Sequence, residues 1–137
     1  MRIMALDYGR VHTGVAISDP SGTIVRPLDA VNDASSSDGL MKLKNLVEAE
    51  SVDEVIVGLP VSLSGELGAQ ARETEAFIEA LKPALSVPVH SWDERYTSRI
   101  AAEKGRHSGS DPHSLAACCL LEDYLGSAAF RDRSGGE

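Results

Sequence analysis

The chain has 137 residues, 42% of them hydrophobic and 25% charged, which is typical of one soluble domain with a substantial core. Its formal net charge is −8 and only 4% of its residues are aromatic, which argues against a general nucleic-acid coat and against a platform of several base-stacking rings. No stretch is long and apolar enough to cross a membrane, and the N-terminus lacks a signal-peptide pattern, so we expect a cytoplasmic protein without a membrane partner.

The first quarter of the chain predicts three β-strands joined by tight turns. Strands are expected over residues 2–7, 12–18 and 23–31, and the Asp-Pro-Ser-Gly sequence at 19–22 is a strong turn signal. Three consecutive strands with such short connections form an antiparallel meander.

The rest of the chain alternates between helices and strands. A Ser- and Asp-rich loop over 32–38 should end in a helix N-cap, and Asp111 followed by Pro112 is a favourable start for the last helix. A strand that follows a helix pairs in parallel with an earlier strand. The order predicts an α/β fold with one five-stranded mixed sheet, antiparallel in strands one to three and parallel in strands four and five, and helices on both faces. The expected elements are helix 39–50, strand 53–60, helix 69–85, strand 87–92, helix 97–105 and a last helix that stops near residue 126.

We expect residues 1–126 to form a single domain and residues 127–137 to form a flexible tail, because the last residues are small and charged. Cys118 and Cys119 are adjacent within an apolar run and have neither a zinc-site spacing nor a disulfide pattern. They are therefore expected to be reduced and buried in the core.

Asp7 is the first candidate site residue, because it stands where a short apolar strand should reach the surface. Gly9 follows in the turn, and Gly14 begins a second apolar run. A carboxylate held at the end of a central strand suits a metal ligand or a group that positions a phosphate-bound metal. The alternative is that Asp7 accepts backbone N–H bonds in a tight turn.

Further acidic residues are predicted at the same rim of the sheet as Asp7. Asp93 and Glu94 end the fifth strand, and Asp111 opens the last helix. Carboxylates gathered on one rim repel one another unless a cation joins them, which favours a site for one or two Mg²⁺ or Mn²⁺ ions. Glu94 could instead form a surface ion pair with the neighbouring arginines.

Basic and hydroxyl side chains lie near these carboxylates in the sequence. Arg95 and Arg99 belong to the densest basic stretch of an otherwise acidic chain, and Arg10 and His12 lie beside Asp7. Together they could hold a nucleic-acid backbone over the metals, although charge runs are also common on solvated helix faces. The loop after the fourth strand could add phosphate contacts through its backbone N–H groups and through the hydroxyls of Ser62 and Ser64, or it could be a plain turn.

Several sequence blocks, in the same order over nearly the whole chain, resemble the YqgF/RuvX family. The blocks are LDYG at 6–9, GVAISD at 14–19, VIVGLP at 55–60, DERYTS at 93–98 and SLAA at 114–117. The resemblance implies a ribonuclease H-like fold and a metal-dependent nuclease, either a Holliday junction resolvase or a nuclease that matures the 5′ end of pre-16S rRNA. It also implies that Asp7, Glu94 and an acidic residue at the start of the last helix hold the metals.

Two positions depart from the family pattern. His12 stands where the family usually has Arg. His113 stands where the family has the Asp that precedes the Ser-Leu-Ala-Ala run, and Asp111 lies two residues earlier. Either Asp111 completes the metal site or His113 is itself a ligand. Because an imidazole suits Mn²⁺ better than Mg²⁺, His113 as a ligand predicts a preference for Mn²⁺.

The resulting mechanistic hypothesis is in-line hydrolysis of a phosphodiester by water activated between two ions that Asp7 bridges, leaving a 3′-hydroxyl and a 5′-phosphate. Arg95 and Arg10 would hold the flanking phosphates. A resolvase that cuts two strands symmetrically would be a homodimer. Two alternatives are a phosphate-binding domain of the actin-like or sugar-kinase type, which normally needs two such domains, and a catalytically inactive nucleic-acid-binding module.

Overall fold

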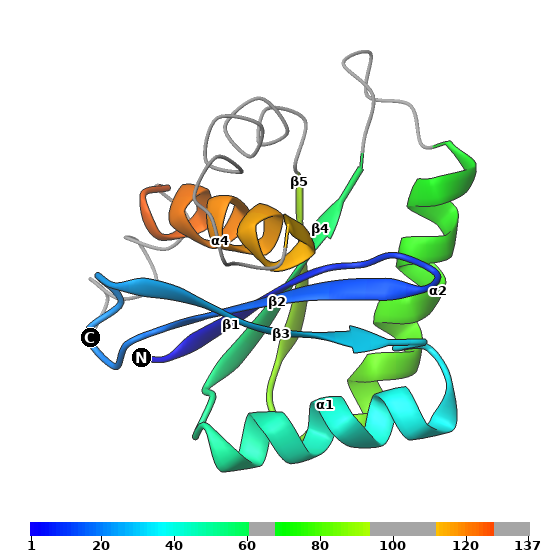
Figure 1. Cartoon of the computed structure of the whole chain (residues 1–137), viewed down its shortest axis with the longest axis horizontal. Helices are drawn as coiled ribbons and strands as arrows, with labels where there is room; N and C mark the ends of the chain where they lie inside the picture. Colours follow the sequence, from blue (N-terminus) through cyan, green and yellow to red (C-terminus); the bar gives the residue numbers. More distant parts are fainter. Residues whose placement is uncertain (61–67, 94–111, 128–137) are drawn as a thin grey trace.

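The structure is a computed structural model that describes residues 1–60, 68–93 and 112–127 (Figure 1). The predicted helix over 97–105 and the predicted tail after residue 127 lie outside these ranges. Within them the elements are, in chain order, β1 (Ile3–Asp7), β2 (His12–Ser18), β3 (Val25–Asn32), α1 (Ser37–Ala49), β4 (Glu54–Leu59), α2 (Ala69–Ala84), β5 (Val89–Asp93) and α4 (Pro112–Leu125). No helix in the described ranges has the length and apolar character needed to span a bilayer.

The five strands form one sheet in the order β3-β2-β1-β4-β5. β1 pairs antiparallel with β2, and β2 pairs antiparallel with β3, whereas the β1–β4 and β4–β5 pairs are parallel. The predicted mixed sheet, a meander followed by parallel strands, is therefore confirmed. In the β1–β2 register Asp7 lies opposite Gly14, at the end of β1 where the chain turns back.

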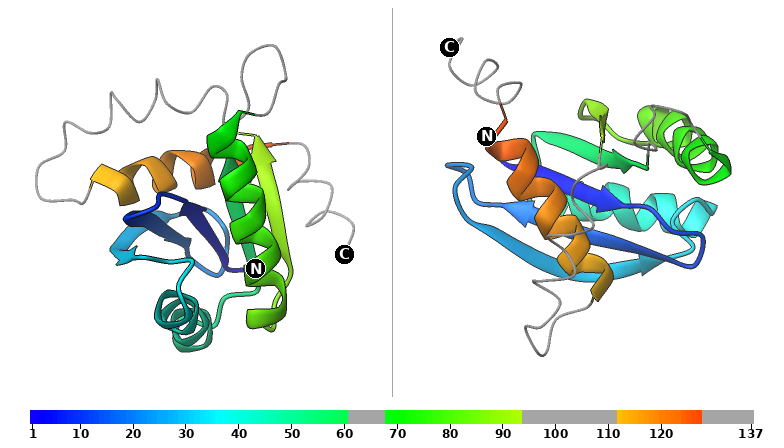
Figure 2. Two further views of the ribbon diagram at one scale, coloured as in Figure 1. Left: turned by 90° about the vertical axis from the view of Figure 1, so that its right-hand side faces the viewer. Right: turned by 90° about the horizontal axis from the view of Figure 1, so that it is seen from above.

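Helices cover both faces of the sheet, as predicted (Figure 2). Successive side chains of a strand point to opposite faces, so β1 divides its apolar residues between two cores. Met4 and Leu6 pack in a cluster with residues of α1 and α2, and Ile3 and Ala5 pack in a second cluster with α4. Alternate residues of a strand therefore face different helices, either α1 and α2 on one side of the sheet or α4 on the other.

Most element boundaries lie within two residues of the sequence prediction, and at two of them side chains that capture backbone N–H groups explain the difference. β3 begins at Val25, two residues later than predicted, since the Asp19 carboxylate accepts hydrogen bonds from the N–H groups of Thr23 and Ile24 at 2.8 and 2.9 Å. α1 begins at Ser37 rather than at Gly39. Its N-cap is Ser36, whose hydroxyl accepts from the N–H of Gly39 at 3.0 Å.

The C-terminal part of α4 is fixed to the sheet by polar contacts. The Tyr124 hydroxyl donates to Oε1 of the fully buried Glu54 at 2.7 Å, and Trp92 Nε1 donates to Asp123 at 2.8 Å. The half-buried Trp92 ring packs edge-to-face with the Tyr124 ring, with the ring centroids 5.1 Å apart. The two cysteines of α4 are buried in the core, as expected.

Candidate functional site

The site is organised by the residues of β1 and β2 that face α4. Ile3 and Ala5 contact α4, so the alternation of β1 places Asp7 on the same face. Ala16 also packs on α4, and the same parity along β2 places Gly14 and His12 there. Asp7 thus lies at the end of the central strand, half-buried, beneath the beginning of α4.

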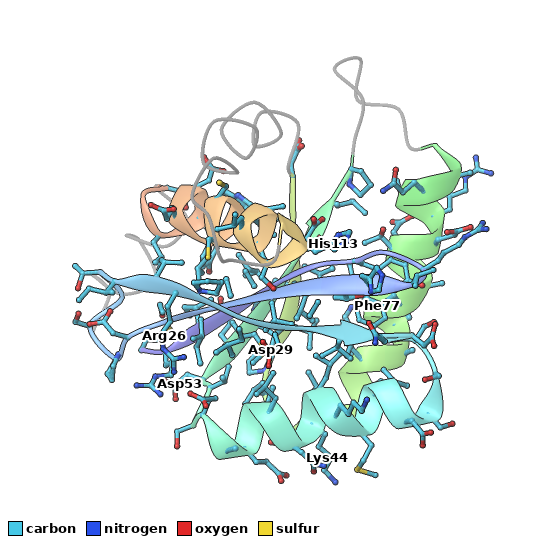
Figure 3. All side chains as sticks on the ribbon, in the orientation of Figure 1. Arg26, Asp29, Lys44, Asp53, Phe77 and His113 are labelled. Atoms are coloured by element: carbon cyan, nitrogen blue, oxygen red, sulfur yellow. The ribbon has the colours of Figure 1, made fainter. Side chains whose placement is uncertain are left out.

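The first turn of α4 lies directly against the backbone of β2. A Cβ atom at Gly14 would overlap the carbonyl group of His113 and would lie 2.8 Å from the N of Ser114. Only a residue without a side chain allows this approach. Figure 3 shows His113 at the start of α4, near the end of the sheet where β1 turns into β2.

Two imidazoles and a carboxylate meet at this point. The ring centroids of His12 and His113 are 5.1 Å apart, and His12 Nδ1 lies 2.8 Å from Oδ1 of Asn32 on β3. Burial raises the pKa of Asp7 above its usual range, and the charge of the neighbouring His113 opposes that rise. Within the described ranges, no donor hydrogen-bonds the Asp7 carboxylate, so the alternative in which Asp7 caps its own turn is not supported.

Arg10 is at the tip of the β1–β2 turn and faces α2 rather than α4. Its guanidinium forms a bidentate ion pair with Glu73, donating from Nε to Oε2 at 2.9 Å and from Nη2 to Oε1. The hydrogen bond and charge of Glu73 raise the pKa of Arg10, and the same contact lowers the pKa of Glu73. Together with Tyr8, which stacks on Phe77, these residues line a cavity of about 290 Å³ between the turn and α2. The predicted phosphate ligand Arg10 is thus already paired with a carboxylate.

The described ranges contain only part of the predicted site. Asp7, Arg10, His12 and His113 are described, and the structure brings Asp7, His12 and His113 together. Six predicted site residues lie outside the described ranges, namely Ser62, Ser64, Glu94, Arg95, Arg99 and Asp111. The described residues alone contain no group of three or more His, Cys, Asp or Glu side chains that could hold a metal ion.

Asp93, the acidic neighbour of Glu94, is on the other face of the sheet. Val89 packs in the cluster with α1 and α2, and Ser91 lines a cavity beside α2, so the parity of β5 directs Asp93 to that side. Asp93 therefore faces the opposite side of the sheet from Asp7, although the sequence predicts both carboxylates at one rim.

Three residues near the site were not singled out from the sequence. In the sequence Gly14 marks only the beginning of an apolar run, although a glycine inside a strand often marks a close backbone approach. Ser114 is part of a family block, and its contacts with β2 and β3 have no sequence signal. Glu73 pairs with Arg10 across 63 residues of sequence, and no local pattern reveals such a contact.

Comparison with known proteins identifies a family. A family model described as "RuvX: Holliday junction resolvase" matches residues 1–127. A protein of Thermoanaerobacter pseudethanolicus named "Putative pre-16S rRNA nuclease" is 39% identical over 135 residues, which cover 93% of this chain and 97% of that protein. A protein of Rubrobacter xylanophilus with the same name is 42% identical over 130 residues, which cover 90% of this chain and 91% of that protein.

Comparison with solved structures identifies the same architecture. The structure titled "T. thermophilus RuvC in complex with Holliday junction substrate" matches with a TM-score of 0.64 and 16% identity, covering 98% of this chain and 96% of that chain. A second Thermus thermophilus RuvC structure matches with a TM-score of 0.60 and 17% identity, covering 98% and 97%. At this identity the likeness concerns the fold alone, and it bears out the predicted ribonuclease H-like fold.

Proposed function

We propose a function from one premise, that this chain belongs to the RuvX family of Holliday junction resolvases, which are nucleases. The proposal is that it hydrolyses phosphodiester bonds in structured nucleic acid with the help of divalent cations. Membership in a family of nucleases favours this reaction over the actin-like or sugar-kinase alternative. The observation that carries the proposal is the placement of the desolvated Asp7 carboxylate beneath the start of α4, beside His113.

The environment of Asp7 fits a cation. A half-buried carboxylate whose pKa is raised by burial, with no hydrogen-bond donor to it within the described ranges, is destabilised as an anion, and a divalent cation would offset that cost. The proposed ligands are Asp7, Glu94 and either Asp111 or His113. Bound ions would neutralise charge on the phosphoryl oxygens and activate water. Among the proposed ligands, His113 favours Mn²⁺ over Mg²⁺ because imidazole is a softer ligand than a carboxylate.

The chain's own residues would position the nucleic acid. The β1–β2 turn fixes Arg10 and His12 on opposite sides of Asp7, towards α2 and α4 respectively. Both could contact phosphates that flank the scissile bond, together with Arg95, Arg99 and the loop that contains Ser62 and Ser64. His12 is oriented for this role by Asn32, which holds its Nδ1 and directs Nε2 away from β3.

The substrate can be tested with a labelled four-way DNA junction and a structured RNA that carries the precursor end of 16S rRNA. Each is incubated with Mn²⁺, with Mg²⁺ or with EDTA. We expect cleavage of at least one substrate, faster with Mn²⁺ than with Mg²⁺ at matched occupancy, and none with EDTA. Symmetric junction cuts would assign a resolvase that works as a dimer, and RNA cleavage alone would assign rRNA maturation. Binding without cleavage under all conditions would contradict the proposal in favour of an inactive binding module.

The Arg10–Glu73 ion pair predicts that nucleic acid competes with Glu73 for the guanidinium. We expect Glu73→Gln to tighten nucleic-acid binding by about two- to five-fold at low salt. Removing the Glu73 charge leaves the Arg10 guanidinium available to a phosphate, and the effect is small because an exposed ion pair is weak. Binding is measured by fluorescence anisotropy, with Asp7→Asn present in every protein so that the substrate stays intact. Glu79→Gln is the control, since it removes the same charge from α2 but pairs with Lys82 instead. Equal affinities of the two variants would argue that Arg10 does not contact the substrate.

A further inference from the structure

The pairing of β2 with β3 is interrupted where α4 begins. Thr13 pairs with Val31 but Val15 pairs with Leu28, so two steps along β2 correspond to three steps along β3. β3 therefore contains one extra residue between these pairs, which is the definition of a β-bulge. The interruption lies at Gly14, the residue opposite Asp7.

The hydroxyl of Ser114 fills this interruption. Its oxygen accepts a hydrogen bond from the N–H of Val15 at 3.2 Å and donates one to the carbonyl of Leu28 at 2.6 Å. Ser114 is completely buried, and its hydroxyl is therefore joined to the backbones of two strands at once. The first turn of α4 is attached to the sheet by this bridge and by the close contact of its backbone with Gly14.

This attachment connects the two sides of the candidate metal site through backbone atoms and a single side-chain group, the Ser114 hydroxyl. On one side, Ser114 immediately follows His113 in α4. On the other side, β2 is bound to Ser114 at Val15 and pairs with Asp7 through Gly14. The Ser114 hydroxyl and the paired backbones of β1 and β2 thus fix the position of the α4 start relative to Asp7.

We propose that Ser114 is a positioning residue of the nuclease site, which sets the distance between Asp7 and the metal ligand at the beginning of α4. The inference rests on the proposed function, because it supposes that this end of α4 carries a ligand. A metal site tolerates displacements of only about 0.5 Å, and loss of a group that orients a ligand commonly weakens metal affinity or activity by about 10- to 100-fold. Ser114 itself does not touch the substrate or the metal.

The chain offers a matched control at the other end of the same helix. Tyr124, like Ser114, is buried in α4 and hydrogen-bonds to the sheet through one hydroxyl, but its partner Glu54 lies at the opposite end of β1 from Asp7. Ser114→Ala and Tyr124→Phe each remove one buried hydroxyl without adding atoms. If Ser114 only stabilises the fold, the two variants should behave alike.

The experiment compares the wild type, Ser114→Ala and Tyr124→Phe by thermal unfolding, by Mn²⁺ binding measured with electron paramagnetic resonance, and by the Mn²⁺ dependence of cleavage. We expect both variants to lower Tm. Only Ser114→Ala should raise the Mn²⁺ concentration at half-maximal activity and the Kd for Mn²⁺, by about 10- to 100-fold, with nucleic-acid affinity unchanged within about two-fold. Ser114→Cys keeps the same side-chain connectivity, with a larger atom and a weaker hydrogen-bonding group, and it should show the same shift if Ser114→Ala does not fold.

Each outcome decides between the inferences. Wild-type Mn²⁺ affinity in the Ser114 variants, or equal losses in Tyr124→Phe, would overturn the positioning role while leaving the nuclease intact. If the wild type binds Mn²⁺ but cleaves neither substrate, the proposed function fails, and a selective loss of Mn²⁺ affinity in Ser114→Ala still supports positioning. If the wild type neither binds Mn²⁺ nor cleaves, both proposals are wrong.

Discussion

Asp7→Asn is expected to reduce cleavage by about 100-fold or more and, at the same time, to stabilise the protein in the absence of metal. The loss of activity follows because Asn removes the negative charge with which we propose that the chain binds cations at the end of β1, and single preorganised charge-stabilising groups contribute on this scale. Nucleic-acid binding should persist, since the flanking contacts remain. The measurement is cleavage under single-turnover conditions with Mn²⁺, beside an anisotropy assay of binding.

The gain in stability follows from the sign of the pKa shift. Burial raises the pKa of Asp7 in the folded state, so the folded protein binds a proton more tightly than the unfolded chain does. Folding is therefore penalised once the pH rises through the folded-state pKa, and Asn escapes that penalty. In EDTA the Tm of Asp7→Asn should exceed that of the wild type near pH 7, and the difference should disappear as the pH is lowered below the ordinary Asp range.

Metal reverses this order of stability. At a Mn²⁺ concentration of 100 times the Kd, binding should stabilise the wild type by about 2.7 kcal/mol and leave Asp7→Asn nearly unaffected. An Asp7→Asn protein that is less stable than the wild type in EDTA, or that responds equally to Mn²⁺, would show that Asp7 is held by structural hydrogen bonds instead.

Gly14→Ala is expected to impair both folding and catalysis. The new Cβ would overlap the His113 carbonyl and lie 2.8 Å from the N of Ser114, and these backbone atoms cannot rotate away as a flexible side chain could. The start of α4 would have to move off the sheet, at a cost of about 3 kcal/mol in the free energy of unfolding. A displacement of roughly 1 Å between catalytic groups costs on the order of 100-fold in rate. Urea unfolding and Mn²⁺-dependent cleavage measure the two effects.

Gly126→Ala is the control for this prediction. Gly126 directly follows α4, and a Cβ there would meet its nearest neighbour, the Glu122 carbonyl oxygen, at an ordinary 3.5 Å. Its free energy of unfolding should change by no more than about 0.5 kcal/mol. Equal stability and activity of the two variants would refute the claim that Gly14 is the contact between α4 and β2.

The sheet could be predicted from the sequence because its signals are local. The apolar run before Asp7, the turn at Gly9 and the strand endings at Pro60 and Asp93 each mark a strand without reference to the rest of the chain. The alternation of helices and strands after residue 37 then leaves few arrangements other than a parallel addition to β1. The boundaries of β3 and α1 could not be predicted, since several Ser, Thr and Asp side chains compete as caps and only the folded contacts decide among them.

The site was predictable only in part, for a different reason. Asp7 is recognisable from its place at the end of a strand, and His113 from its departure from the family block. Their proximity depends on the register of β1 against β2 and on the approach of α4, which are tertiary properties. The Ser114 bridge and the Arg10–Glu73 ion pair are also long-range contacts. The local sequence around these three residues gives no sign of either contact.

Crystals soaked with Mn²⁺ and measured at the manganese absorption edge would locate the metal directly. We predict an anomalous peak about 2–2.5 Å from a carboxylate oxygen of Asp7, with a further ligand from the start of α4, either Asp111 or His113. The peak should be lost in crystals of Asp7→Asn. A saturating soak with no peak at Asp7, in protein that cleaves nucleic acid, would contradict the assignment of Asp7 as the central metal ligand.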